Sequence, residues 1–589
     1  MYIRMQLHKI IKILFLILGC FSLASAASQN FAIVDVTVIP MNRERTLEHQ
    51  TVLIKNDIIS DIGSTSKLTI PPSFQRIDGK GRFLIPGLTD AHVHLFSSTE
   101  LPLYLVNGVT TVFNLNGRPP YLLWRKWIQK GKMSGPTIYS AGPAFTTKHT
   151  PEEAVKMVDE QAAAGYDAVK IYNEVGREEY GPLIAEAKKK NLLLMGHVAR
   201  EPGFEATLEA GQSIAHAEEF TYTFFNPAHD DSFSHIVFDE SKIPTAAKMT
   251  AAAGIYVIPT ISTFRDIIRQ ATDLKQYLGN PEFKYLAPWI LETLQPGFNR
   301  YDNRYSPEDL KQLQLSLPFQ RKLIHALEKE GVPLMCGTDS TNIGPIAGFS
   351  IHEELSELVS SGLTPYQALQ TATTSPAKYL RRSNDYGTIE KGKHADLALL
   401  RANPLLDIRN TKQIDGVMVH GQWLGVEALK KTLEAIPPSY VIQIKTEKEL
   451  LKSDPKQAGN YLDEQDPWGL IGGTAIADLA TDQKPEGFRS FLHSLHDKIP
   501  DSALVSEETM NGVGYTLLTK KHPELALVAF EINTENFPKS PNAFDSLAEA
   551  YAKTGSTGHA LEYYAKALKL NANYPNAEFA RKFIEQNKK

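Results

Sequence analysis

Strand-like and helix-like segments alternate along residues 86–385, and this alternation constrains the fold of the 589-residue chain most strongly. The helical patterns include Glu152–Ala164, Tyr180–Lys190 and Glu353–Ser361. The predicted strands are the one that ends at His94, then Val109–Asn114, Thr137–Ser140, Ala168–Tyr172, Leu192–His197, Ser213–His216, Ile255–Pro259 and Val332–Asp339. Such alternation implies parallel βαβ units, and eight of them predict an α/β fold, a (β/α)8 TIM barrel.

Two β-rich stretches flank the predicted barrel. In residues 27–85, β-branched residues dominate 31–39, and a polar Asn56-Asp57 pair separates two apolar runs as in a hairpin. Residues 386–430 repeat this pattern, with a turn near His420-Gly421. We therefore expect both stretches to join in one small composite β-sandwich domain.

The C-terminal part of the chain contains an internal repeat. Residues 431–505 carry no readable motif and are interpreted as a linker of unknown role. Residues 506–589 resemble a pair of tetratricopeptide (TPR) repeats followed by a capping helix at Asn576–Asn587, which predicts an all-α domain. At an offset of about 34 residues, small or aromatic residues pair as Gly514 with Ala548, Ala526 with Ala560, and Phe530 with Tyr564. Two repeats are few for independent stability, so we expect them to pack on another domain, self-associate or bind a protein partner.

Residues 1–26 have the pattern of an export signal. Arg4, Lys9 and Lys12 precede an apolar run, and Ala24-Ser25-Ala26 supplies small residues for cleavage. The pattern predicts an exported protein, periplasmic or secreted, without a transmembrane helix once mature. A retained membrane anchor and a lipoprotein attached at Cys20 are the alternatives. The net charge of -5 argues against a nucleic-acid partner.

The segment Ile85-Pro-Gly-Leu-Thr-Asp-Ala-His92-Val-His94 carries the strongest chemical signal. Residues two apart on a strand point to the same face, so His92 and His94 present two imidazoles side by side. Asp90 lies on that face and could orient a histidine. A His-x-His pair alone is a weak indication of a metal site, so the rest of the chain has to support it.

Three further strand ends carry metal-binding side chains, namely His197, His216 and Asp339. Active sites of TIM barrels lie at the C-terminal ends of the strands, so these groups should converge with His92 and His94. Each alone is equally consistent with a hydrogen-bonded histidine or a helix-capping aspartate. Together they predict a hydrolytic metal site, because imidazole and carboxylate are typical zinc ligands.

The order His-x-His, strand-end Lys, His, His, Asp resembles the amidohydrolase superfamily over roughly residues 31–430, and its imidazolonepropionase-like and Xaa-Pro dipeptidase-like members most closely. The resemblance implies two divalent metal ions, expected to be Zn²⁺, bridged by a carboxylated Lys170. It assigns His92, His94 and Asp339 to one ion and His197 and His216 to the other. Without the carboxylated lysine, we would expect a single metal.

A hydrolytic mechanism follows from the implied metals. Zinc lowers the pKa of bound water to about 7, and the resulting hydroxide would attack an amide carbonyl. Asp339 would take the proton and pass it to the leaving amine, and Tyr172 could stabilise the oxyanion. Tyr222 and Arg200 are candidates for binding a substrate carboxylate. His352 and Cys336 are interpreted as structural.

The predicted substrate is a dipeptide or an N-acyl amino acid. A cyclic amide, a carbamate or a lactone would fit the same site, because all pass through a similar tetrahedral oxyanion. A non-catalytic TPR binding protein built on an inactive barrel is the alternative from another class. The complete set of candidate ligands argues against that alternative.

Overall fold

The computed structural model describes residues 30–226, 236–302, 305–342, 344–572, 574 and 576–587. The predicted signal peptide at 1–26, with Cys20, lies outside the described residues. Within the described part, no helix has both the length and the apolar character that a membrane crossing requires. The chain divides into two compact units. The first comprises Met1–Leu95, Glu100–Asn280 and Tyr301–Ala435, and the second Phe96–Thr99, Pro281–Arg300 and Ile436–Lys589.

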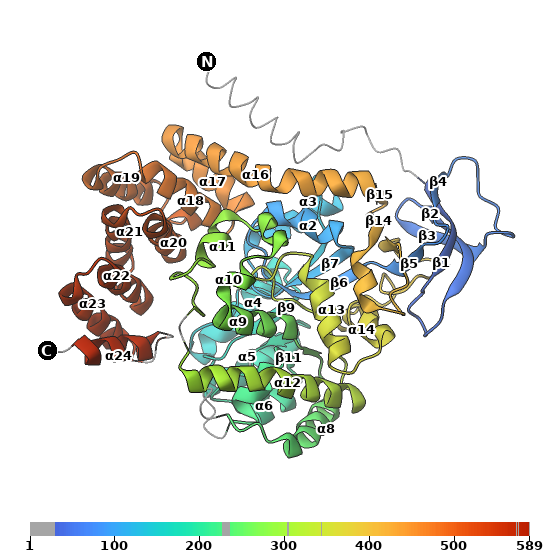
Figure 1. Cartoon of the computed structure of the whole chain (residues 1–589), viewed down its shortest axis with the longest axis horizontal. Coiled ribbons are helices and arrows are strands. Elements are labelled where there is room, and N and C mark those ends of the chain that lie inside the picture. The colour runs from blue at the N-terminus through green and yellow to red at the C-terminus, as the bar shows by residue number, and fades with distance from the viewer. Residues whose placement is uncertain are drawn as a thin grey trace. The chain divides into compact units, whose positions relative to one another are not determined.

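Two parallel sheets form the centre of the first unit (Figure 1). One contains β6 (Leu88–Val93), β7 (Val109–Asn114) and β8 (Thr137–Ser140). The other contains β9 (Ala168–Ile171), β10 (Leu193–Gly196), β11 (Ser213–Ala215) and β12 (Val257–Ile258). These strands confirm seven of the expected segments, and β6, β7 and β9 are buried along their whole length.

Parallel bridges connect the ends of the two sheets. Ala141 pairs with Ala168, which joins β8 to β9. The stretch predicted as the eighth strand, Val332–Asp339, makes one bridge, from Leu334 to β12, and the next residue, Ser340, makes another to β6. It is not a regular strand, because Gly337 passes against His92 too closely for a Cβ atom and Asp339 turns to a φ of 54°. The arrangement is of the TIM-barrel type.

Helices follow the strands as the periodicity predicts. Helix α4 (Pro151–Ala164) begins with a capping box between Thr150 and Glu153 and ends at Gly165, whose φ is 92°. The other first-unit helices are α2 (Leu101–Val106), α3 (Pro119–Gln129), α5 (Arg177–Lys189), α6 (Gly203–Glu209), α7 (Glu218–Thr223), α8 (Ile243–Ala253), α9 (Ile261–Thr272), α10 (Leu274–Tyr277), α12 (Pro307–Lys329), α13 (Ser350–Ser360), α14 (Pro365–Thr371) and α15 (Thr374–Tyr379).

The two β-rich flanks join as expected, but in one mixed sheet of order β15-β14-β13-β5-β1-β2-β3, with β4 paired to β1. The predicted sandwich of two sheets is therefore wrong in detail, because continuous strand pairing links both flanks. His420 and Gly421, both at positive φ, form the expected β14–β15 turn. The strands are β1 (Asn30–Val38), β2 (Leu47–Lys55), β3 (Ile58–Ser64), β4 (Gln75–Asp78), β5 (Phe83–Pro86), β13 (Leu397–Leu400), β14 (Ile414–Val419) and β15 (Gln422–Gly425).

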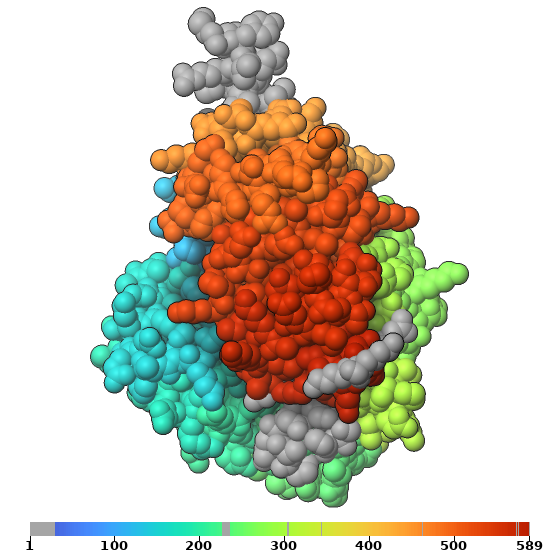
Figure 2. All heavy atoms as spheres, turned by 90° about the vertical axis from the view of Figure 1, so that its left-hand side faces the viewer, coloured from blue at the N-terminus to red at the C-terminus, as the bar shows by residue number. Residues whose placement is uncertain are grey.

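The described residues of the C-terminal part form helices joined by short turns, and this includes 431–505, which was predicted as a linker of unknown role. Figure 2 shows the surface of these helices, coloured orange to red. A Cβ atom at Gly514 would lie 2.4 Å from the Phe530 ring, so a small residue is required there. The tetratricopeptide assignment itself stays a prediction. The helices are α16 (Val426–Ser453), α17 (Pro455–Gln465), α18 (Leu470–Ala480), α19 (Pro485–Lys498), α20 (Glu507–Thr519), α21 (Pro523–Asn536), α22 (Pro541–Lys553), α23 (Thr557–Leu570) and α24 (Ala577–Asn587), and the second unit also holds α11 (Pro288–Thr293).

Candidate metal centre

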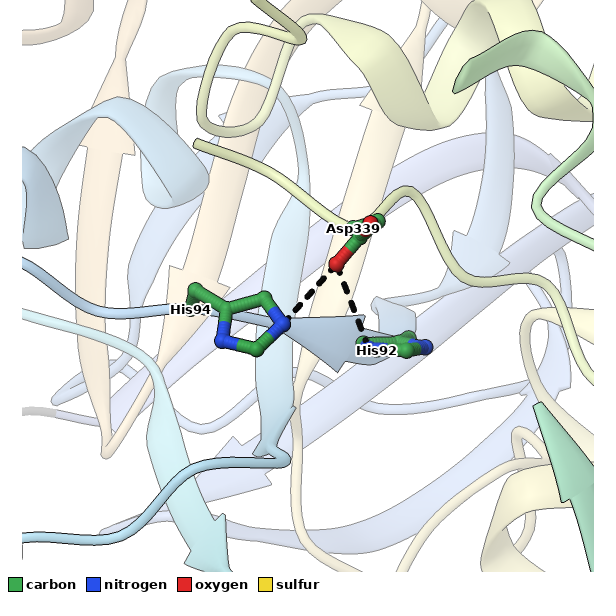
Figure 3. A group of neighbouring side chains, drawn as sticks. All are labelled: His92, His94 and Asp339. Atoms are coloured by element: carbon green, nitrogen blue, oxygen red, sulfur yellow. Dashed lines mark ion pairs between the residues drawn. The ribbon is translucent and has the colours of Figure 1, made fainter. Parts of the chain in front are cut away.

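His92, His94 and Asp339 form a buried cluster at the end of β6 (Figure 3). One carboxylate oxygen of Asp339 lies 2.9 Å from Nε2 of His94 and 3.3 Å from Nε2 of His92. The backbone N–H of Asp339 donates to the His92 carbonyl at 2.7 Å, which fixes the aspartate beside the strand. The three side chains offer ligand atoms within 4.8 Å of one another, so they could hold one metal ion.

Two more histidines continue this cluster as a row of rings. The ring centroids of His92 and His216 are 4.7 Å apart, and those of His216 and His197 are also 4.7 Å apart. Tyr172 follows, with its ring 4.5 Å from that of His197. The side chains predicted from separate strand ends therefore do converge. Burial lowers the pKa of all three of these imidazoles, that of His216 to about 3, so they are neutral and able to bind metal.

Lys170 lies inside β9 and is fully buried. Within the described residues, its amine has no hydrogen-bond partner, and it lies 5.4 Å from the centroid of the Tyr172 ring. Burial lowers the pKa of this amine to about 8, although the charges of Asp339 and Glu219 oppose the shift. A large fraction of Lys170 is thus neutral near pH 8, which is unusual for a lysine.

Glu219, which orients the ring of His197, was not among the residues predicted for the site. Nδ1 of His197 donates to Glu219 at 2.9 Å, and Arg200 donates to the same carboxylate at 2.6 Å. Burial alone would raise the pKa of Glu219, but Arg200 and His197 together lower it well below its usual range. Its position three residues after His216, at the start of a short helix, was the available signal.

Arg200 and Tyr222 were predicted to bind a substrate carboxylate. The structure instead pairs Arg200 with Glu219 and with the carbonyl of Val198, at 2.6 Å in each case. The guanidinium also lies 5.3 Å from the centroid of the Tyr222 ring. The bonds that the structure shows therefore support His197, and a substrate role for the two residues stays a prediction.

The sequence suggested that Asp90 orients a histidine ring, but the hydrogen bonds seen in the structure go elsewhere. Its carboxylate accepts hydrogen bonds from the backbone and hydroxyl of Thr338, at 3.0 and 2.7 Å, and from the His92 backbone at 3.3 Å. Burial raises the pKa of Asp90 to about 7, although these bonds lower it. Asp90 thus joins β6 to the stretch that carries Asp339. The ring of His216 is oriented by Thr260, whose hydroxyl lies 2.8 Å from Nδ1.

His352 and Cys336 have the structural environments expected of them. Nδ1 of His352 lies 2.9 Å from the hydroxyl of Thr411, and the side chain is buried. The thiol of Cys336 is fully buried, and burial raises its pKa well above the usual value. A thiol with a raised pKa is a poor nucleophile.

The donor set fits a metal centre. Several buried polar atoms of the centre have no hydrogen-bond partner among the described residues, including both ring nitrogens of His92 and the amine of Lys170. Unpaired buried polar atoms cost free energy, and a bound cation would remove that cost. Neutral imidazoles and carboxylates are the ligands that hydrolytic zinc sites use.

Replacing Glu219 by glutamine should weaken metal binding by about 10- to 100-fold, because ligand histidines depend on the group that holds their second nitrogen. Competition with a chelator, followed by metal analysis, measures this loss. Glu218, the preceding residue on α7, provides a matched Glu218→Gln control. Equal metal affinity in the two variants would contradict the role of Glu219.

A TIM-barrel-type fold with imidazole and carboxylate groups gathered at its strand ends is the arrangement of metal-dependent hydrolases. Over residues 104–424 the chain matches the family described as "Amidohydrolase family", and it belongs to that family. This confirms the resemblance drawn from the order of the candidate ligands and the expected class of enzyme.

Known proteins similar to this chain act on different compounds. This chain is 22% identical to 5-methylthioadenosine/S-adenosylhomocysteine deaminase of Clostridium tetani, over 66% of this chain and 91% of that protein. It is 24% identical to imidazolonepropionase of Alkaliphilus metalliredigens, over 62% of this chain and 86% of that protein. A crystal structure of a Xaa-Pro dipeptidase with bound methionine has a TM-score of 0.53 and 20% identity, and covers 67% of this chain and all of that one, which shows a shared fold.

Proposed function

We propose that this protein is a hydrolase with two divalent metal ions that cleaves an amide bond next to a free carboxylate, in a dipeptide or an N-acyl amino acid. The observation that carries the proposal is the buried amine of Lys170. It has no hydrogen-bond partner among the described residues, and it interacts electrostatically with Asp339 and the neighbouring histidines. A lysine ammonium is poorly accommodated there, whereas a bridging anion fits.

The proposed ligands divide as the family resemblance implies. His92, His94 and Asp339 would hold one ion, and His197 and His216 the other, with Zn²⁺ the expected metal. Carbon dioxide adds to a neutral amine, so a new N–C bond forms and one amine proton leaves to solvent. The resulting carbamate of Lys170 would offer an anionic oxygen to each ion.

This carboxylation should make reconstitution of the metal-free protein depend on pH. The pKa of Lys170 is lowered to about 8, so the amine is mostly neutral above pH 8. Well below pH 8, the neutral fraction falls about tenfold for each pH unit. At a fixed concentration of dissolved carbon dioxide, we expect the rate of activation by zinc to fall in the same way. A rate that is independent of pH between 6 and 8 would contradict the carboxylation.

The bound ions would supply an acidified water and polarise the scissile carbonyl. Asp339 is the proposed proton carrier; burial would raise its pKa, but the His94 imidazole and neighbouring charges outweigh burial and lower it. The carboxylate is therefore ionised and can accept a proton from water, then donate it to the leaving amine. Tyr172, whose ring lies against His197, is the proposed donor to the oxyanion.

The proposed substrate class has support from the shared fold with a Xaa-Pro dipeptidase. Cyclic amides are the second candidate, because imidazolonepropionases are among the curated relatives. A panel of dipeptides, N-acyl amino acids, hydantoins, carbamates, lactones and adenosine derivatives separates these classes. Hydrolysis of dipeptides would support the first proposal, and cleavage of a hydantoin without any dipeptide would favour the second.

We also propose a cellular location for the enzyme and two residues that bind the substrate carboxylate. The export signal predicted at 1–26 would place the enzyme in the periplasm or outside the cell, where peptides can be scavenged. Arg200 and Tyr222 are the proposed contacts for the substrate carboxylate. Because Arg200 already binds Glu219, a substrate carboxylate would have to share the guanidinium with that carboxylate or replace it.

A further inference from the structure

The first turn of α9 lies beside the candidate ligand His216. Thr260 directly precedes this helix, is buried, and has a φ of 48°, in the left-handed region. A threonine in this position ordinarily accepts a hydrogen bond from an N–H group of its own helix, but Thr260 makes no such bond. Its hydroxyl lies instead 2.8 Å from Nδ1 of His216. Thr260 thus contacts the metal centre rather than capping its helix.

The direction of this hydrogen bond fixes the tautomer of His216. The Thr260 hydroxyl donates its single proton to the carbonyl of Pro259, at 2.8 Å. Toward His216 the hydroxyl can then only accept, so the proton of the neutral ring lies on Nδ1. A neutral histidine binds a metal through its unprotonated nitrogen, which here is Nε2. The Thr260 hydroxyl therefore selects the ring nitrogen that His216 can offer to a metal.

Glu354, on α13, satisfies the N–H groups that Thr260 leaves open. The first N–H groups of a helix have no partner within that helix. The carboxylate of Glu354 is fully buried and accepts from the N–H of Ile261 at 3.2 Å and from that of Ser262 at 2.8 Å. A negative charge is also favourable at a helix N-terminus. A side chain from another helix thus caps α9 in place of Thr260.

The same turn of α9 also contacts the stretch that carries Asp339. The hydroxyl of Thr263 donates to the carbonyl of Thr338 at 2.6 Å. Thr338 directly precedes Asp339, and its own backbone N–H and hydroxyl bind Asp90. The first turn of α9 is therefore hydrogen-bonded both to His216 and to the residue next to Asp339.

We propose that Glu354 is a positioning residue of the metal centre, which holds the first turn of α9 and so keeps the Thr260 hydroxyl on Nδ1 of His216. Without the Glu354 carboxylate, two buried N–H groups would lack their acceptor, which is costly. Thr260 would then be drawn to cap its own helix, as threonines in this position ordinarily do, and would release the ring of His216. The inference rests on the proposed function, because that function makes His216 a metal ligand.

Two pairs of variants of the full chain test the inference. Glu354→Gln keeps the shape of the side chain but removes its charge and one acceptor oxygen. Glu357→Gln is the matched control, because Glu357 is also buried on α13 but accepts from the side chains of Arg265 and Arg321, at 3.0 and 2.6 Å, rather than from the backbone after Thr260. Thr260→Ala removes the hydroxyl on His216, and Thr260→Ser keeps it.

Three measurements at pH 8 follow these changes. Nitrogen NMR of metal-free protein labelled in histidine shows which ring nitrogen of His216 carries the proton, and a His216→Asn variant assigns the signals. Hydrogen exchange reports on the N–H groups of Ile261 and Ser262. Competition with a chelator gives the affinity for zinc. The tautomer is the decisive measurement, because a purely structural role of Glu354 would not change it.

We expect the proton on Nδ1 of His216 in the parent protein, in Thr260→Ser and in Glu357→Gln. Glu354→Gln and Thr260→Ala should instead give a mixture of the two tautomers. In Glu354→Gln, exchange at 261 and 262 should become about 10-fold faster, and zinc should bind about 10-fold more weakly. Glu354→Asp, which keeps the charge but withdraws the oxygens, should act in the same direction and serves if Glu354→Gln does not fold.

A proton on Nε2 of His216 in the parent protein would overturn the inference. The same holds if the ring of His216 is unchanged in the Glu354 variants, whatever happens to the zinc affinity. If the parent protein binds no zinc, the proposed function fails, and the nitrogen spectra still decide whether Glu354 positions the ring.

Discussion

Replacing Asp339 by asparagine is expected to lower kcat/KM by about 10³-fold or more, because the proposed mechanism gives this residue two roles, as a metal ligand and as the proton carrier. An amide of the same shape cannot accept and return the proton. Its oxygen is also a weaker ligand than the carboxylate oxygen that lies 2.9 Å from His94 and 3.3 Å from His92. Steady-state kinetics with the best substrate of the panel, beside metal analysis, measures both losses.

Asp90→Asn is the control for that experiment. Asp90 is also a buried carboxylate close to His92, but it binds Thr338 and backbone rather than an imidazole. Its replacement should therefore reduce stability more than it reduces the chemical step. Equal losses of kcat/KM in the two variants, with metal bound in both, would contradict the special role of Asp339.

Replacing Lys170 by alanine should abolish measurable activity, and a short carboxylate such as acetate or propionate should restore part of it. The truncated side chain leaves space where the carbamate would lie, and a free carboxylate can supply the same two oxygens. Activity is measured as a function of the added acid at constant ionic strength, with zinc in excess.

The matching control is a primary alkylamine of the same length. If Lys170 acts as an ammonium, the amine should restore activity and the carboxylate should not. Rescue by the amine alone would therefore contradict a carboxylated lysine. Lys170→Met offers a second comparison, because a filled apolar space should prevent rescue by either compound.

The sequence predicted that the candidate metal ligands would lie close together, because their positions follow from strand geometry. His197 and His216 directly follow the short strands β10 and β11, and a parallel sheet brings such ends together. The eighth strand was less predictable. Its apolar pattern indicates a strand, but the contact of Gly337 with β6 and the left-handed φ of Asp339 depend on tertiary packing that no local pattern records.

The residues that support the ligands were also harder to predict. Glu219 and Thr260 hold the rings of His197 and His216. The position of Glu219 three residues after His216 was a weak signal, and Thr260 has no spacing that marks it in the sequence. Arg200 was interpreted as a substrate contact because the sequence does not show that Glu219 is the partner of this loop arginine. In the C-terminal part, the absence of a motif in 431–505 suggested a linker, although amphipathic and buried helices occupy it.

The number of metal ions per chain, in the parent protein and in Lys170→Ala, tests the central claim most directly. Elemental analysis after reconstitution with zinc and bicarbonate should give about two ions in the parent and a clear loss in the variant, because the bridging ligand has been removed. One ion in both proteins would contradict the bridged pair, and no ion in the parent would contradict the metal-dependent hydrolase itself.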